Sequence, residues 1–235
     1  MLLMQRAARL PVRRRLCGDD AAPACQRDGD ERRLLGCGAG EVGEMTDRLK
    51  RSEWLVQDIP LKQARDFIIE HHYSKGCSNT RVYSHGLFRV DSPTLYGVAM
   101  WLPPTKVAAQ SVNKDKWQKV LSLTRLACHP DAPKNAASFL MASSIKLIKR
   151  EGRFVSLVTY ADVRMGHTGA IYKATNWNYV GEMKGSPAWI DPSTGKQVAR
   201  KSTISRTNKE MLDLGYECIG VFGKHKFIMH LEANT

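Results

Sequence analysis

The sequence predicts an α+β fold built on a mixed, mostly antiparallel β-sheet flanked by helices. Between Val120 and Met183, segments with strand and helix periodicity alternate, which is typical of a crossover connection between parallel strands. On both sides of this unit, short apolar strands separated by turns predict antiparallel pairs. The length of 235 residues fits one domain with an appendage.

The appendage is predicted at the N-terminus. Residues 1–44 are rich in Arg, Gly, Asp and Ala, have almost no aromatic or β-branched residues, and hold three of the six cysteines. This composition cannot build a packed core, so we expect a disordered or non-native N-terminal extension, with the functional domain spanning residues 45–235 from Met45.

The charge distribution indicates the class of partner. The chain has a formal net charge of +13, and residues 1–44 hold 8 basic and 7 acidic residues, so 12 of these excess positive charges lie beyond residue 44. A basic folded part favours a polyanion such as nucleic acid or a phosphorylated cofactor. The cysteines show no paired or metal-like spacing, and no apolar run approaches the roughly 18 residues of a membrane span. We therefore expect a cytoplasmic protein without a membrane partner.

The elements before the crossover begin with a helix. After Pro60, the segment LKQARDFIIEHH places apolar residues on one helical face, and SKGCSNT (residues 74–80) is a polar loop. Residues 82–90 and 94–102 then read as two strands joined by a tight turn. They predict an antiparallel pair, followed by a connecting helix or loop over residues 106–117.

The crossover itself contains two strands and a helix. Residues 120–128 alternate as a strand, and residues 136–150 have apolar positions at helical spacing, with Asn135 as the predicted N-cap. Residues 154–160 are nearly all apolar, which is typical of a buried strand. A strand that enters a helix through a polar turn presents backbone N–H groups where an anion can bind.

The C-terminal third is predicted to close the sheet. A hairpin is expected around residues 191–195, and Thr207 with Glu210 forms a capping box for a short helix. Residues 217–222 and 226–231 are expected to be two separate closing strands.

The crossover region resembles the GNAT acyltransferases. The resemblance rests on LSLTRLACHPDAPKNAASFLMASSIKLIKR, followed by VSLVTYAD and GAIYKATNWNYVG. In that fold a strand and the next helix N-terminus hold the cofactor pyrophosphate, and a later helix carries a tyrosine in a Y-x-x-x-G-(F/W) pattern. Tyr172 to Trp177 matches it, with Asn176 in place of glycine. The loop from Asp131 to Ala136 lacks the glycines usual for that pyrophosphate site.

A more specific resemblance covers the chain from about Asp47 to its end. HHYSKGCSNTRVYSHGL, LTRLACHPDAPKNAASFL, VTYADVRMGHTGAIYKATNW and GKHKF resemble the Mom proteins of phage Mu and its relatives. This resemblance implies a DNA modification enzyme that converts adenine to carbamoylmethyl-adenine at the exocyclic amino group and so protects phage DNA from host restriction. It implies double-stranded DNA as partner and phage or prophage origin.

Four residues are the candidates for catalysis. The adenine amino group is a poor nucleophile, so it needs orientation, a proton acceptor and removal from the duplex stack. Asp162 at the end of a buried strand can accept the proton, and Tyr73 or Tyr160 can stack on the extruded base. In the GNAT resemblance Tyr172 lies near the leaving atom of the donor and supplies its proton. His72 is a base or a substrate-positioning group. The alternatives are a loop-capping role for Asp162 and a core role for Tyr172.

The expected cofactor is acetyl-CoA or a related acyl-CoA, although the resemblance leaves the donor open. Arg125 and Ser138 flank the predicted anion site and are candidates for donor binding, with Lys134 and Asn135 as loop contacts. A strand salt bridge for Arg125 and a first-turn helical position for Ser138 are the structural alternatives.

A metal site is a further hypothesis. His72, Tyr73 and Asp162 offer the mixed nitrogen and oxygen ligands that suit iron. Because neighbouring residues cannot share one helical face, this site requires the helix to end at this point.

Cations in or near loops are the candidates for DNA binding through phosphate contacts, which give salt-sensitive and sequence-tolerant affinity. The predicted set, which includes two polar residues, is Lys75, Asn79, Arg81, Arg164, His167, Arg200, Lys201, Arg206, Lys224 and Lys226. A solvated basic surface is the alternative for each one. The competing functions for the whole chain are an N-acetyltransferase of small molecules or proteins and a non-catalytic DNA-binding protein.

Overall fold

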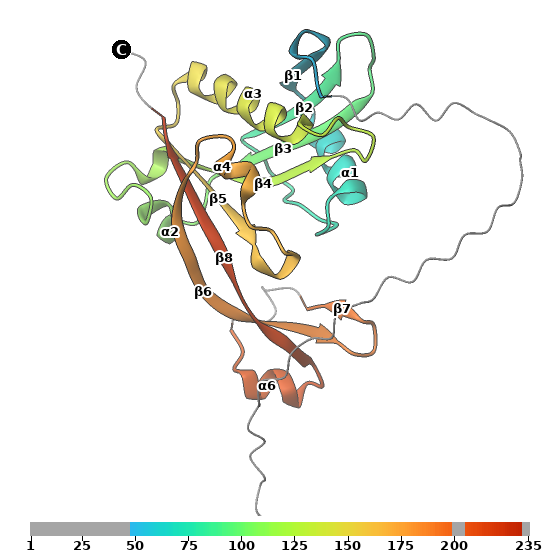
Figure 1. Cartoon of the computed structure of the whole chain (residues 1–235). Helices are drawn as coiled ribbons and strands as arrows, with labels where there is room; N and C mark the ends of the chain where they lie inside the picture. Colours follow the sequence, from blue (N-terminus) through green and yellow to red (C-terminus); the bar gives the residue numbers. More distant parts are fainter. Residues whose placement is uncertain (1–47, 199–204, 232–235) are drawn as a thin grey trace, which may run out of the picture. The chain divides into compact units, whose positions relative to one another are not determined.

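The protein is built on one mixed β-sheet, described here from a computed structural model that covers residues 48–198 and 205–231 (Figure 1). The predicted N-terminal extension lies outside these residues. The eight strands of the described part follow the order β1-β2-β3-β4-β5-β8-β6-β7. Their bounds are β1 Trp54–Asp58, β2 Tyr83–Arg89, β3 Leu95–Leu102, β4 Val120–Cys128, β5 Ser156–Asp162, β6 Asn178–Asp191, β7 Lys196–Gln197 and β8 Glu217–His230.

Each neighbouring pair of strands is antiparallel except β4 and β5, which are parallel. The predicted fold class and the crossover are thus confirmed. The helices are α1 Leu61–His71, α2 Lys106–Gln110, α3 Ala136–Glu151, α4 Ala170–Lys173 and α6 Asn208–Asp213, with 3₁₀ turns η1 Arg51–Glu53, η2 Trp117–Lys119 and η3 Val163–Met165. None of the described helices is long and apolar enough to cross a membrane.

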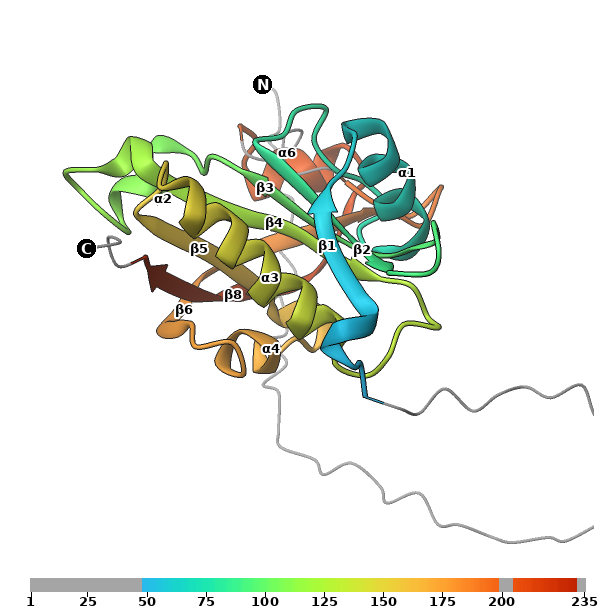
Figure 2. The same ribbon diagram turned by 90° about the horizontal axis from the view of Figure 1, so that it is seen from above.

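Helices cover both faces of the sheet because side chains alternate along each strand. On β3, Val98 and Met100 pack against α1, whereas Ala99 and Trp101 pack in the cluster that contains the apolar residues of α3. Figure 2 shows α3 lying along the sheet. The core is therefore divided by the sheet into two apolar layers.

Sequence signals set several of the element boundaries. The capping box is present: the Thr207 side chain accepts from the Glu210 N–H, and the Glu210 carboxylate accepts from the Thr207 N–H. Helix α1 ends where His72 turns to an extended backbone, at φ −94° and ψ 137°. Asn176 has φ 64°, a left-handed conformation that asparagine tolerates better than most residues. Asparagine can therefore occupy the position at which the GNAT pattern has glycine.

Two predictions for the strands were wrong or incomplete. Residues 217–230 form one continuous strand, β8, rather than two strands around residues 223–225. The reason is that β6 pairs with β8 along nearly its whole length and takes up the irregular positions as bulges. Strand β1 was not predicted, because its five residues lack clear apolar alternation.

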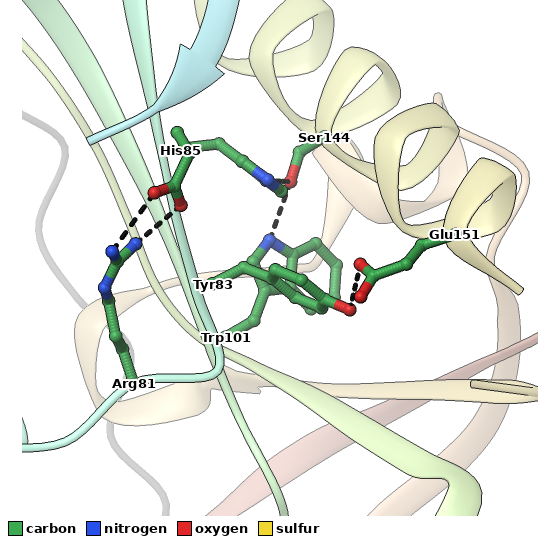
Figure 3. A network of polar contacts seen from close by, with 7 residues as sticks. Arg81, Tyr83, His85, Trp101, Ser144 and Glu151 are labelled. Atoms are coloured by element: carbon green, nitrogen blue, oxygen red, sulfur yellow. Dashed lines mark hydrogen bonds and ion pairs between the residues drawn. The ribbon is translucent and has the colours of Figure 1, made fainter. Parts of the chain in front are cut away.

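A buried polar network joins β2, β3 and α3 within the core. The Trp101 Nε1–H donates to the Ser144 Oγ at 2.7 Å, and the His85 Nδ1 lies 2.6 Å from the same oxygen. Figure 3 shows both rings directed at Ser144, with Tyr83 bonded to Glu151 beside them. The network satisfies buried polar atoms whose desolvation would otherwise destabilise the fold.

Candidate active site

The candidate active site lies where β4 and β5 separate. The two strands pair only from Val120 to Leu123 and from Ser156 to Thr159, while β4 continues to Cys128 and β5 to Asp162. A pocket of about 590 Å³ opens between the separated ends. Its walls come from the C-terminal end of α1, β4, β5, the loop after η3 and α4. Residues from helices on opposite faces of the sheet therefore meet in one cavity.

The β4 side of this pocket is a strand edge. Residues Leu123 to Cys128 line the cavity, and they pair on their other side with β3. Since β5 has diverged, backbone N–H and C=O groups of this part of β4 face the cavity, where an extended ligand can bond to them as an added strand does. The strand edge thus forms a binding wall for an elongated donor.

An aromatic wall forms the opposite side. The rings of His72 and Tyr73 lie 4.3 Å apart, and the Tyr73 ring meets that of His167 edge-on at 5.3 Å. Tyr73 is 46% exposed, which leaves much of its ring free to contact a ligand. All three residues line the pocket. Such a wall can stack on a planar base.

His72 is held as a neutral hydrogen-bond donor. Burial, together with the charges of Arg125 and His167, lowers its pKa to about 4. Its Nδ1 accepts from the Ser74 N–H at 3.1 Å and lies 2.9 Å from the Ser74 Oγ, an arrangement that suits the tautomer with the ring proton on Nε2. At neutral pH, His72 is therefore suited to positioning a substrate acceptor atom, and it is a weak base.

Tyr172 lies on α4 at the opposite end of the pocket. Burial raises the pKa of its hydroxyl, so this group stays protonated at neutral pH. The ring packs against Trp177 and Phe227, with centroid distances of 5.9 and 5.1 Å. These contacts fix the position from which the hydroxyl can donate a proton. Tyr172 therefore packs in the core, as the structural alternative predicted, and also lines the pocket, as the functional reading predicted.

Asp162 ends β5 directly after Tyr160 and Ala161, which line the pocket, but its own side chain lines the neighbouring second cleft instead. Its Oδ1 accepts from the Arg164 N–H at 3.1 Å, which is the loop-capping arrangement offered as the alternative. Its charge also reaches the pocket, because it contributes to raising the pKa of Tyr73 after the larger effect of burial. One carboxylate thus caps η3 and faces the region around Tyr73.

Arg125 supports the wall formed by the α1 end. Its Nε donates to the Gly76 carbonyl at 2.8 Å, and its Nη1 donates to the Thr124 carbonyl at 2.7 Å. The side chain lines the pocket and holds the loop after His72. Within the described part of the chain, Arg125 forms no salt bridge along the strand, which was the alternative for this residue.

The other predicted cofactor residues do not line the pocket. Asn135 occupies the predicted N-cap position, but its Oδ1 accepts from the Leu49 N–H at 2.8 Å instead of capping α3. The Ser138 hydroxyl donates to the Asn135 carbonyl, and Lys134 is exposed. The residue at the start of α3 that does line the pocket is Ala137.

The iron hypothesis gains no support from the geometry. Among residues 48–198 and 205–231, no group of three or more His, Cys, Asp or Glu residues gathers as a metal site. The α1 helix does end as that hypothesis required, yet the His72 Nδ1 is occupied by Ser74 and Asp162 caps η3. The His72, Tyr73 and Asp162 set therefore does not form the predicted ligand cluster.

The predicted DNA-binding residues fall into distinct places. Arg164, Arg206 and Lys224 line a second cleft, and His167 lines the main pocket. Lys75 donates to the Glu70 carbonyl at the end of α1, and Asn79 is exposed in the following loop. The remaining members of the predicted set are Arg81, Arg200, Lys201 and Lys226.

Two of these four make side-chain contacts within the described fold. Arg81 forms a two-pronged ion pair with Asp58, at 2.5 and 3.1 Å. Lys226 is buried, and its Nζ donates to the Ser111 carbonyl and hydroxyl oxygens. Arg200 and Lys201 lie outside the described residues.

One residue that sequence reasoning missed is Gly169, which precedes α4. It has φ 73°, and a Cβ at this position would lie 2.2 Å from the Phe227 ring. Only glycine therefore allows the loop to pack on Phe227 and close the pocket. The signal was the glycine in GHTGA, two residues after His167.

Comparison with known proteins agrees with this architecture. The model of the Mom protein family matches residues 53–234. The methylcarbamoylase Mom of Escherichia phage Mu is 28% identical over 197 residues, which cover 78% of each protein.

Solved structures show similarity of fold. The crystal structure of Arabidopsis thaliana NAA60 in complex with a bisubstrate analogue is 9% identical, with a TM-score of 0.50 over 77% of this chain and 99% of that chain. The ribosomal-protein-S18-alanine N-acetyltransferase of Escherichia coli is also 9% identical, with a TM-score of 0.48 over 77% of this chain and 96% of that one. The predicted GNAT-like fold is thus confirmed. With a family match that spans nearly all of the described residues, the chain belongs to the Mom protein family.

Proposed function

We propose that this protein is a transferase that modifies adenine in DNA, placing a carbamoylmethyl group on the exocyclic amino nitrogen. The observation that carries the proposal is the pocket between the separated ends of β4 and β5, which Tyr172 lines and next to which Asp162 ends β5. Membership of the Mom family supports the choice of acceptor and group. The product would protect phage DNA from restriction in the host cytoplasm.

The acceptor side is formed by the aromatic wall. An adenine within a duplex cannot reach a cavity of this kind, so the base must leave the stack. Tyr73 offers a partly exposed ring for stacking, and the Nε2–H of His72 can donate to an acceptor nitrogen of the base. Asp162 then accepts the proton that leaves the amino group as the new bond forms.

The donor side is formed by the β4 edge. A donor that carries the whole carbamoylmethyl group, with a leaving atom on its methylene carbon, would lie along Leu123 to Cys128, where the strand offers backbone hydrogen bonds. A simple acyl-CoA transfers its carbonyl carbon, so it does not supply this group in one step. The new bond joins the amino nitrogen to the methylene carbon of the group, and the bond from that carbon to its leaving atom breaks. Tyr172, protonated at neutral pH, gives its proton to the leaving atom. Arg125 keeps the wall of the pocket in place.

The test is the chemical state of adenine in DNA. The full chain is expressed in bacterial cells, and total DNA is digested to nucleosides and analysed by mass spectrometry. We expect a deoxyadenosine carrying one carbamoylmethyl group, absent from cells with the empty vector. Unmodified adenine in cells that contain folded, soluble protein contradicts the proposal, and release of CoA with small amines would then identify an N-acetyltransferase.

A further inference from the structure

A second cleft lies beside the candidate active site, on the other side of Asp162. It has a volume of about 400 Å³ and lies between η3, β6, β8 and the start of α6. Strand β5 ends at Asp162, opposite Lys224, so residues 217–223 of β8 pair only with β6. Figure 1 shows this two-stranded part of the sheet extending past β5 towards α6. The cleft is formed at the base of this extension.

The charges in the cleft favour an anion. Arg164 comes from η3, Arg206 from the chain just before α6, and Lys224 from β8. Among the described residues that line the cleft, Asp162 is the one acid. Three cations from three separate elements that meet around one cavity create the positive potential that attracts a phosphodiester chain.

An aromatic surface accompanies these charges. The Arg164 guanidinium lies 5.9 Å from the centroid of the Phe222 ring, and this ring lines the cleft and is half-buried. Cations interleaved with an aromatic ring are the combination by which proteins hold a nucleic acid strand, since phosphates pair with the cations and bases stack on the ring.

The position of the cleft relates it to the reaction. Asp162 lines this cleft, while its charge acts on Tyr73 in the main pocket. The loop that follows Asp162 contributes Arg164 to the cleft and His167 to the main pocket. A DNA strand held in the cleft would therefore pass next to Asp162 at the point where an extruded base enters the main pocket.

From these observations we infer that the cleft is the binding site for the DNA strand next to the target adenine, with Arg164 and Lys224 contacting its phosphates. This inference rests on the proposed function and adds the place where the substrate strand is held. The ligand class is a phosphodiester chain. CoA carries phosphates too, so the test separates these two sources.

The test is the salt dependence of DNA binding by the full chain. Fluorescein-labelled single-stranded and duplex oligonucleotides are titrated at several KCl concentrations, with the variant Arg164→Gln/Lys224→Gln and the wild type. The matched control is Lys146→Gln, an exposed lysine on α3 that lines neither cavity. We expect the slope of log K against log salt to fall by about 2 in the double variant, about 1 for each phosphate contact. The control keeps the wild-type slope.

Two results overturn the inference while leaving the proposed function intact. One is an unchanged slope in the double variant while the wild type still modifies DNA. The other is weaker CoA binding with unchanged DNA binding, which assigns the cleft to the donor. Conversely, wild-type protein that binds DNA through the cleft but leaves adenine unmodified refutes the proposed function alone. Should the double variant not fold, Lys224→Gln alone carries the test, with an expected fall of about 1.

Discussion

His85 and His72 both have a pKa lowered by burial, yet they lie in different surroundings. His85 shares a hydrogen bond with Ser144, a fully buried residue whose hydroxyl also accepts from Trp101. His72 lies against the half-exposed ring of Tyr73 at the pocket, and within the described residues its hydrogen bonds involve Nδ1, which leaves Nε2 for a ligand.

The difference separates structural from functional polar groups. In the His85 network, the partners come from β2, β3 and α3, so the hydrogen bonds connect elements of the core. In the His72 cluster, the hydrogen-bond partner belongs to the same loop, and the ring also borders an open cavity. Changes in the first cluster should therefore lower the free energy of unfolding, while changes at the pocket should lower activity and leave the fold in place.

The largest expected effect is on the pocket side. Tyr172→Phe removes the proton donor but keeps the ring packed against Phe227, so we expect modification to fall about 10²- to 10⁴-fold with little change in unfolding. The measurement is the rate at which modified deoxyadenosine accumulates. Tyr179→Phe is the matched control, because the Tyr179 hydroxyl bonds His225 outside the pocket. Equal rates in the two variants would rule out the role of Tyr172.

On the core side, Ser144→Ala should reduce the free energy of unfolding by about 2–4 kcal/mol, because it leaves the Trp101 and His85 nitrogens without their common partner. Denaturant unfolding measures the change. Ser84→Ala is the control: this buried hydroxyl has no hydrogen-bond partner among the described residues, so its removal should cost less than about 1 kcal/mol. Similar losses in both variants would contradict the assignment of Ser144.

A smaller effect is expected from the exposed ring. Tyr73→Ala should weaken binding of DNA that contains the target adenine by about 1–3 kcal/mol, which is the usual contribution of one base stacked on an aromatic side chain. Tyr73→Phe should bind as the wild type does, because the ring remains. Affinity measured by fluorescence anisotropy distinguishes them, and a loss in both variants would show that the hydroxyl matters instead.

The smallest effect concerns pH. The pKa of His72 is about 4 in the folded protein and near 6.5 in the unfolded chain, so the unfolded state binds more protons between these values. Its contribution to stability is complete above pH 6.5 and is lost as the pH falls towards 4. His72→Gln should therefore show a shallower decline in unfolding free energy over this window. The pKa of His85 is lowered in the wild type and in the variant alike, so this residue affects both stability curves equally. Parallel curves would contradict the role of His72.

The sequence was a better guide to the elements of the fold than to the contacts that each side chain makes. Strand and helix periodicity located β4, α3 and β5, because burial imposes those periods locally. The separation of β4 from β5 has no local signal in the sequence, and it was implied only by the GNAT resemblance, in which the second strand diverges from the first. Tyr172 and the part that β4 plays in holding a cofactor were both expected from the GNAT resemblance.

Long-range partners explain the remaining errors. Asn135 bonds Leu49, which is 86 residues earlier, and Arg81 pairs with Asp58 across β1 and β2. Neither partner can be read from a window of neighbouring residues. Conversely, the end of α1 at His71 and the exposure of Tyr73 followed from the polar SKGCSNT loop, so this wall of the site was predictable.

The most direct test of the account is Asp162→Asn, measured as modified deoxyadenosine in digested cellular DNA at equal amounts of soluble protein. The amide oxygen can still accept from the Arg164 N–H, so the cap of η3 and the fold should persist. We expect carbamoylmethyl-adenine in wild-type cells and at least about 100-fold less of it in variant cells, because the proton acceptor is lost. Wild-type levels of modification in the variant would contradict it.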